Sequence, residues 1–206
     1  MSLTVIIIIV TVVMSIAAWN RPDRMAKWIL NPYRVSQNRE YYRFISSGMI
    51  HNDYMHLFIN MFVFYSFGTI VEQIFRYMHG SGGYVYYLIL YFAGMVVADI
   101  PSFIKYRNMP GYNSLGASGA VSAVVFSSIL FNPTDKILLF FIIPMPGFVF
   151  ALLYLIYSYF EGRRMAGNVN HDAHLYGALF GIVFTVIIYP QVLVSFLDKI
   201  TSYKLF

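Results

Sequence analysis

The chain has 206 residues, of which 59% are hydrophobic, 19% aromatic and only 11% charged, and its formal net charge is +5. This composition argues against a soluble domain and indicates an integral multi-pass membrane protein. The sequence contains no cysteine, which excludes disulfides, thiolate metal sites and cysteine catalysis. Its Lys and Arg residues are scattered rather than clustered, so we expect a lipid bilayer and no nucleic acid as the partner of the positive charge.

Six apolar segments are each about as long as the roughly 20 residues that cross a hydrocarbon core. They predict an all-α membrane protein with six transmembrane helices, forming a single domain over residues 1–206. The first segment lacks the basic start and the cleavage site of a signal peptide, so we expect it to be retained. The fifth contains Pro144, Pro146 and Gly147, which predict a kinked or mobile helix. The segments are 3–19, 54–74, 84–103, 115–131, 137–160 and 173–194.

The connection between the first two segments, residues 20–53, is the only long polar one. It carries six Lys or Arg residues interspersed with Trp and Tyr, which favours a structured element in the membrane interface. The connections after the first, third and fifth segments hold ten basic residues, against four on the other side. The positive-inside rule would place this first loop in the cytoplasm, unless its basic residues belong to a folded element.

Three separate polar sites interrupt the apolar segments. His56 and Asn60 are four residues apart, so they share one face of a helix. Ser118 lies among small residues, and His174 opens the last segment. An ionisable group at membrane depth is a functional-site hypothesis by default, and a serine beside a histidine is the minimum apparatus for nucleophilic catalysis. Because small residues allow close helix approach, Gly177 and Gly181 predict that the segments of Ser118 and His174 pack together.

The polar residues fall into short motifs of defined spacing. These motifs are Tyr42-Arg43, His51-x4-His56-x3-Asn60, Gly68-x3-Glu72, Gly116-Ala117-Ser118-Gly119 and Ala173-His174-x2-Gly177-x3-Gly181. Together they resemble the rhomboid family of intramembrane serine proteases over residues of about 40 to 185. The resemblance implies a six-helix rhomboid-like bundle with an interfacial first loop, both termini in the cytoplasm, and no cofactor or metal.

The resemblance also implies a role for each matching residue. Ser118 would attack the scissile carbonyl of a transmembrane protein substrate, and His174 would take its proton without an acidic third partner. The oxyanion would be held by His56, Asn60 and the backbone N–H at Ser118. Gly116 and Ala117 are also expected among the residues that bind the oxyanion or the substrate. The remaining matches are expected to be structural: Arg43, His51, Glu72, Gly177 and Gly181. Glu72 is further expected to pair with Arg76, four residues along its helix, and to anchor the first loop.

One position departs from the family pattern. Four residues after the serine the family often has an aromatic ring against which the histidine stacks, and here that residue is Ser122. The sequence leaves four alternatives for holding His174: stacking on Tyr176, Phe62 or Phe64, or a hydrogen bond to Ser122. Asp172 is a poor orienter, because two residues along a helix point about 200° apart.

Two other functions are compatible with these residues. One is a catalytically silent membrane-protein binding module of the same fold. The other is a metal-dependent hydrolase or ion transporter that uses the imidazoles and one carboxylate, which suit zinc. Its residues would be His51, His56, His171, Asp172 and His174. If the protein is bacterial, we expect it in the plasma (inner) membrane.

Overall fold

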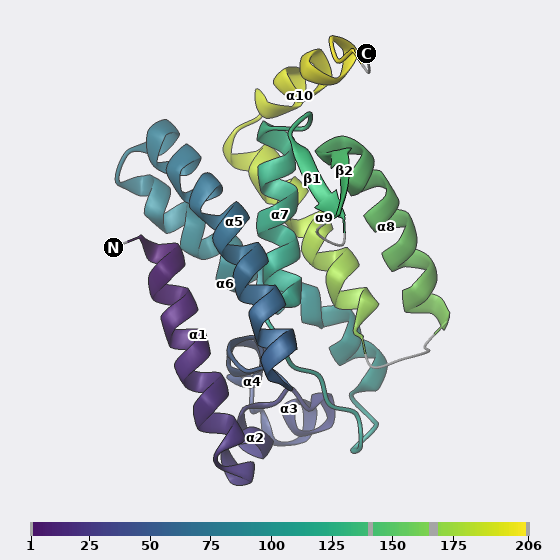
Figure 1. Cartoon of the computed structure of the whole chain (residues 1–206). Coiled ribbons are helices and arrows are strands. Elements are labelled where there is room, and N and C mark those ends of the chain that lie inside the picture. The colour runs from purple at the N-terminus through teal and green to yellow at the C-terminus, as the bar shows by residue number, and fades with distance from the viewer. Residues whose placement is uncertain (1, 140–141, 165–168, 205–206) are drawn as a thin grey trace.

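A computed structural model describes residues 2–139, 142–164 and 169–204 as a helical bundle with one short hairpin (Figure 1). The first helix and the elements of the first connection are α1 (Leu3–Trp19), α2 (Pro22–Trp28), α3 (Pro32–Asn38), α4 (Arg43–Ser46) and a 3-10 turn η1 (Ser47–Met49). The remaining elements are α5 (Tyr54–His79), α6 (Gly82–Tyr106), α7 (Ser118–Phe131), β1 (Lys136–Leu139), β2 (Ile143–Pro146), α8 (Gly147–Arg164), α9 (His171–Ile188) and α10 (Val192–Thr201).

Among the described residues, three helices are long and apolar enough to cross a membrane: α5, α6 and α9. The helices α1 and α7 are apolar but shorter. By length and composition the chain is therefore a membrane protein with at least these three candidate spans, and the count of six stays a prediction.

The fifth predicted segment, 137–160, is wrong in its first half. Residues 136–139 pair in antiparallel register with residues 143–146, and the helix begins only at Gly147. Pro144 and Pro146 have no N–H, and a proline ring inside a helix clashes with the preceding turn, whereas a short edge strand tolerates it. The helix α8 therefore begins later than predicted, at Gly147, and the prolines precede it instead of kinking it.

The sixth predicted segment, 173–194, also divides in two. The helix α9 ends at Ile188, and α10 starts at Val192 after the turn that contains Pro190. A helix rarely continues through a proline, because its nitrogen cannot donate to the preceding turn. Figure 1 shows α10 at the end of the bundle opposite α2, α3 and α4.

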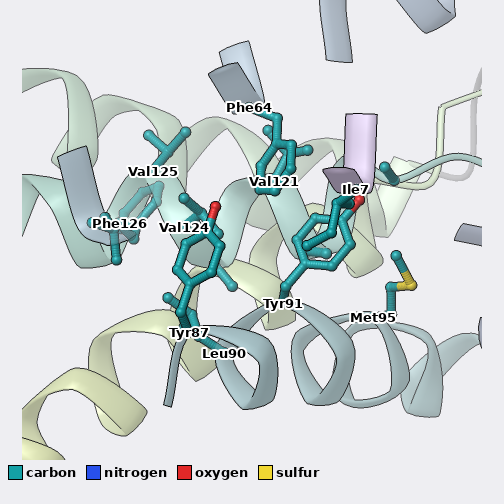
Figure 2. Close-up of a cluster of buried hydrophobic side chains, with 14 of the residues drawn as sticks. Ile7, Phe64, Tyr87, Leu90, Tyr91, Met95, Val121, Val124, Val125 and Phe126 are labelled. Atoms are coloured by element: carbon teal, nitrogen blue, oxygen red, sulfur yellow. The ribbon is translucent and has the colours of Figure 1, made fainter. Parts of the chain in front are cut away.

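The central helix of the bundle is α7, which is buried from Gly119 to Leu130. It packs against α5, α6 and α9, and its small residues let these neighbours approach closely. Figure 2 shows part of the surrounding core, where Val121 and Val124 of α7 lie among Phe64, Tyr87 and Tyr91. The helix that begins with Ser118 is thus surrounded by packed neighbours over most of its surface.

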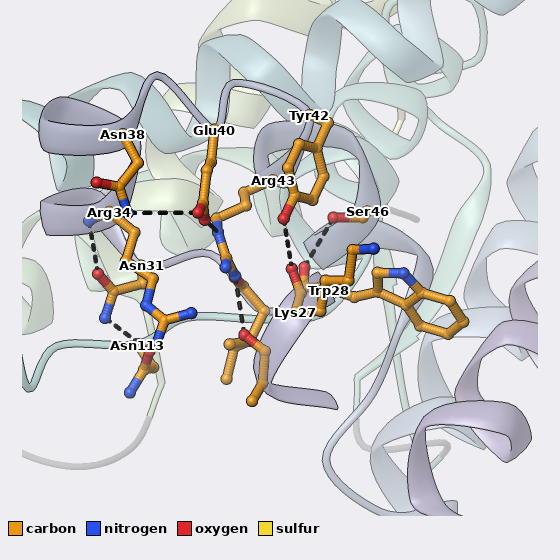
Figure 3. A network of polar contacts seen from close by, with 12 residues as sticks. Lys27, Trp28, Asn31, Arg34, Asn38, Glu40, Tyr42, Arg43, Ser46 and Asn113 are labelled. Atoms are coloured by element: carbon orange, nitrogen blue, oxygen red, sulfur yellow. Dashed lines mark hydrogen bonds and ion pairs between the residues drawn. The ribbon is translucent and has the colours of Figure 1, made fainter. Parts of the chain in front are cut away.

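The first connection is folded, as the sequence predicts (Figure 3). The guanidinium of Arg43 is buried and pairs with Glu40, while its Nη1 donates to the carbonyls of Ala26 at 3.0 Å and Ile29 at 2.7 Å. Arg43 therefore joins α2 to α4 from inside. The burial of this charge is tolerable because it is paired with a carboxylate and its Nε and Nη1 donors have hydrogen-bond acceptors.

The first connection also holds the chain that leads into α7. The backbone N–H groups of Leu30 and Ser114 each donate to the other residue's carbonyl at 3.0 Å. The Asn31 side chain donates to the carbonyls of Pro110 and Tyr112 at 2.9 and 3.2 Å. Residues far apart in sequence thereby fix the approach to Ser118.

The expected pairing of Glu72 with Arg76 is wrong. The Glu72 carboxylate accepts hydrogen bonds from the backbone N–H groups of Leu3 and Thr4, both at 2.9 Å, and from the Thr4 hydroxyl at 2.7 Å. The Arg76 guanidinium instead lies over the ring of Tyr84. The first N–H groups of a helix lack internal partners, so a carboxylate is stabilised there. Glu72 anchors the start of α1 and not the first connection.

Candidate active site

The first turn of α5 presents His56, with Asn60 one turn later. The Asp53 side chain caps this helix by accepting the His56 N–H at 2.8 Å, so His51 precedes the helix, as predicted. The Asn60 amide donates to the His56 carbonyl at 2.9 Å. One of its two N–H donors is thus used within the helix, which leaves the other for a second acceptor.

His51 is fully buried between α1 and the loop that enters α7. Its Nε2 accepts the backbone N–H of Ala117 at 3.3 Å, and its Nδ1 lies 3.2 Å from the Ser15 hydroxyl. Because Nε2 accepts, the proton of the neutral ring must be on Nδ1 and is donated to Ser15. The His51 carbonyl accepts from Trp19 Nε1 at 2.8 Å. His51 therefore holds the loop before Ser118 against α1, the structural role that the motif implies.

Burial lowers the pKa of His51 to about 3, and the nearby His56 acts in the same direction. The unfolded chain binds this proton near pH 6.5, so between pH 6.5 and 3 the unfolded state is favoured as the pH falls. We expect the thermal unfolding temperature to drop below pH 6.5, with a contribution from His51 of at most about 1.4 kcal/mol per pH unit.

The matched variant for this test is His51→Gln, which keeps an acceptor but cannot be protonated. It should be less stable than the wild type at pH 7.5, and the difference between the two unfolding temperatures should narrow toward pH 4.5. Parallel curves for the two proteins over this range would contradict the assignment of the pH dependence to His51.

Gly116 brings the loop before Ser118 against His56. Its φ of +116° lies in a region that L side chains rarely adopt. A Cβ built at Gly116 would be 2.7 Å from Cε1 of the His56 ring. Glycine is therefore required at position 116 for two reasons: its positive φ and the imidazole beside it.

The expected oxyanion donors at Gly116 and Ala117 are already engaged. The Gly116 N–H donates to the Ser47 carbonyl at 2.9 Å, and the Ala117 N–H donates to His51. Both residues therefore shape the loop, and their N–H groups do not point at a substrate. The backbone donor left at this point is Ser118 itself, the first residue of α7, since the first N–H groups of a helix have no internal acceptor.

The helices α7 and α9 meet backbone to backbone. A Cβ at Gly177 would overlap the carbonyl of Gly119, and one at Gly181 would overlap the carbonyl of Ala123. Ser118 adjoins this contact on α7, and His174 lies one turn before Gly177 on α9. The predicted close packing of the two segments is confirmed at these glycines.

No hydrogen bond joins the Ser118 hydroxyl to the His174 ring among the bonds of the described residues. Catalytic hydrogen bonds are often long in the unliganded state and tighten when the substrate binds. A Cβ built on Gly119, the residue after Ser118, would lie 3.4 Å from the Ala173 carbonyl oxygen. The two chain segments thus touch at the residues adjoining Ser118 and His174.

A residue that the sequence did not single out stacks on His174. The Tyr154 ring on α8 lies with its centre 6.2 Å from that of His174, at an interplanar angle of 19°. Its hydroxyl and the Ser122 hydroxyl are 2.7 Å apart. Ser122 thus bonds to Tyr154, while Tyr176 is exposed and Phe64 stacks on Tyr87. The helix α8 is rich in aromatic residues, so no pattern distinguished this one.

The other candidates near His174 have separate partners. Asp172 forms an ion pair with Lys105 at 3.3 Å, consistent with its expected failure to orient His174. The His171 ring lies edge to face with that of His174 at 5.9 Å. Within the described part of the chain, no group of three or more His, Asp or Glu residues is placed to hold a metal ion.

A model of the rhomboid domain matches residues 38–191, which is most of the chain. The chain belongs to the rhomboid family. This match covers the whole site, from the first connection through α9, and agrees with the resemblance carried by the motifs.

Several members of the family are 29 to 30% identical to this chain over the aligned residues. RHOMBOID-like protein 12, mitochondrial, of Arabidopsis thaliana is 29% identical over 74% of this chain and 49% of its own length. Rhomboid protein 1, mitochondrial, of Saccharomyces cerevisiae is 29% identical over 68% and 40%. Presenilin-associated rhomboid-like protein, mitochondrial, of Rattus norvegicus is 30% identical over 66% and 35%. The chain thus spans half or less of these relatives, and their names give no support to a bacterial plasma membrane.

Proposed function

We propose that this rhomboid chain is an intramembrane serine endopeptidase that hydrolyses peptide bonds in or near transmembrane helices of membrane proteins. The observation that carries the proposal is the backbone contact between α7 and α9, which brings the segment of Ser118 against the segment of His174. A nucleophile and its base must be held in such proximity for general-base activation.

In this mechanism His174 takes the proton of the Ser118 hydroxyl as the oxygen attacks the scissile carbonyl carbon. The oxyanion that forms is stabilised by the Ser118 N–H, the His56 ring and the free donor of Asn60. The protonated His174 then gives its proton to the leaving amine. Water, activated by the same imidazole, hydrolyses the acyl-enzyme and restores the Ser118 hydroxyl.

The protein is proposed to work in a lipid bilayer with six spans and without cofactor or metal. Its partners would be transmembrane protein substrates that enter laterally between α5 and α8. A transmembrane helix hides its carbonyls in hydrogen bonds, so a cleavable substrate should contain Gly, Pro or other helix-weakening residues near its end. The folded first connection lets its basic residues lie outside the cytoplasm, so both termini are proposed to be cytoplasmic.

A second candidate is a silent binding module of the same fold. The observation that favours it is the missing hydrogen bond between Ser118 and His174 in the described residues. The two functions differ in the reactivity of Ser118, because a hydroxyl without an effective base is a weak nucleophile.

Covalent labelling distinguishes these two functions. A fluorophosphonate or isocoumarin probe should label the purified wild-type protein, and Ser118→Ala should remove the label because the probe bonds to the activated hydroxyl. His174→Ala should reduce labelling on the order of 10² to 10⁴-fold through loss of general-base catalysis. Intact-protein mass spectrometry measures the adduct. Equal labelling of the wild type and Ser118→Ala would refute the protease proposal, and an unlabelled wild type would favour the silent module.

A further inference from the structure

The proposed base has an aromatic support that comes from a different helix. Tyr154 of α8 lies nearly parallel to the His174 ring of α9, with 6.2 Å between ring centres and 19° between planes. This separation falls within the range of favourable aromatic pairs. The inference that follows rests on the proposed function, since it concerns how the base of that reaction is held.

The Tyr154 ring is itself fixed from several sides. Its hydroxyl lies 2.7 Å from the Ser122 hydroxyl, and its ring contacts Phe126 at 5.5 Å and Phe150 at 5.6 Å. Ser122 lies one turn after Ser118, so the two serines share a face of α7. A chain of contacts therefore runs from that face through Tyr154 to His174.

Among the described residues, no carboxylate pairs with His174 to define the plane of its ring. The neighbouring Asp172 is paired with Lys105, and the His171 ring meets His174 only edge to face. Stacking on Tyr154 is thus the contact that restricts the orientation of the His174 imidazole ring.

We infer that Tyr154 is the positioning residue of His174, and that Ser122 serves by holding the Tyr154 hydroxyl. In this arrangement the ring comes from α8, whereas the family often has it on the helix of the serine, four residues after that serine. The helix α8 fully buries only Gly147 and Ser158. The support of the base therefore belongs to a peripheral helix, and a displacement of α8 changes the setting of the imidazole.

Steady-state cleavage of a reporter transmembrane substrate, with the enzyme in liposomes, tests this role. Tyr154→Leu should lower kcat about 10- to 100-fold, because a misplacement of about 1 Å can cost that much, while KM stays within about twofold. Tyr154→Phe keeps the ring and should stay within about threefold of wild type. The control is Tyr159→Leu on the exposed face of α8, which should leave kcat unchanged. An unchanged or raised kcat in Tyr154→Leu overturns the inference, as does equal damage from Tyr154→Phe.

A relocated ring keeps the test decisive if Tyr154→Leu does not fold. Ser122→Phe combined with Tyr154→Ala moves the ring to α7, into the space next to residue 122 that the tyrosine vacates. This double variant should recover at least tenfold in kcat over Tyr154→Ala alone, and no recovery counts against the inference. Ser118→Ala is assayed in parallel. If wild-type cleavage does not depend on Ser118, the proposed function fails rather than the positioning role.

A measurement that does not depend on catalysis distinguishes failure of the positioning role from failure of the proposed function. In protein labelled with carbon-13 at histidine, a stacked tyrosine shifts the His174 resonance by its ring current, and His174→Gln assigns that signal. Tyr154→Leu should move the resonance toward the free-imidazole value, whereas Tyr159→Leu should not. If the chemical shift of His174 is unchanged in Tyr154→Leu, the inference is overturned whether or not the protein is a protease.

Discussion

Replacing either Ser118 or His174 with alanine should abolish the cleavage of a reporter transmembrane substrate. In serine proteases the nucleophile and its base act as a unit, and removing either one lowers kcat on the order of 10⁶-fold. Ser118 is the first residue of α7 and His174 lies in the first turn of α9, so both alanine substitutions remove a functional group near a helix end. The measurement is product formation in liposomes, with the thermal unfolding temperature of each variant as the check on folding.

Matched variants separate this result from a general effect of substitution. Ser66→Ala removes a hydroxyl that bonds only within α5, to the Phe62 carbonyl. His79→Ala removes an imidazole at the far end of α5, about 35 Å along the helix from His56. Both should cleave at the wild-type rate. Near-wild-type turnover in Ser118→Ala or His174→Ala would show that the catalytic roles are assigned wrongly.

Much of the fold was predictable because lipid imposes a simple rule on sequence. A span must be a long apolar run, and the runs at α1, α5, α6 and α7 were located correctly to within a few residues at most ends. The rule fails where the backbone departs from a helix within an apolar run. Within an apolar run Pro144 and Pro146 predict a kinked helix, whereas the structure has a strand there, because hydropathy alone does not distinguish a strand from a helix.

The site was predictable where spacing along one helix determines the geometry. Gly177 and Gly181 are four residues apart, so their joint face toward α7 followed from the sequence alone. The contacts of Glu72 and Tyr154 did not follow, because each joins helices that are distant in sequence. Nothing local to Glu72 shows that the start of α1 will lie beside it. The engagement of the Gly116 and Ala117 N–H groups depends in the same way on the folded first connection.

Replacing the glycines of α9 that contact α7 should cause the second large effect, a loss of stability. Gly181→Ala should destabilise the protein by about 1 to 3 kcal/mol or more, because the new methyl group meets the Ala123 carbonyl, and backbone cannot yield as a side chain does. The higher helix propensity of alanine favours the variant by only about 0.5 to 1 kcal/mol. The helices α7 and α9 must therefore separate, and the thermal unfolding temperature in detergent should fall.

Gly177→Ala should combine this loss of stability with a loss of activity. The affected carbonyl belongs to Gly119, next to the nucleophile, and Gly177 is one turn from His174. A separation on the order of 1 Å at that point should cost about 10²-fold in kcat even in the fraction that stays folded. The control is Gly82→Ala at the start of α6, where a Cβ has open space, so its unfolding temperature should stay equal or rise slightly. If Gly177→Ala and Gly82→Ala behave alike, then the contact of α7 with α9 does not set the distance between serine and histidine, and the catalytic geometry must depend on other parts of the bundle.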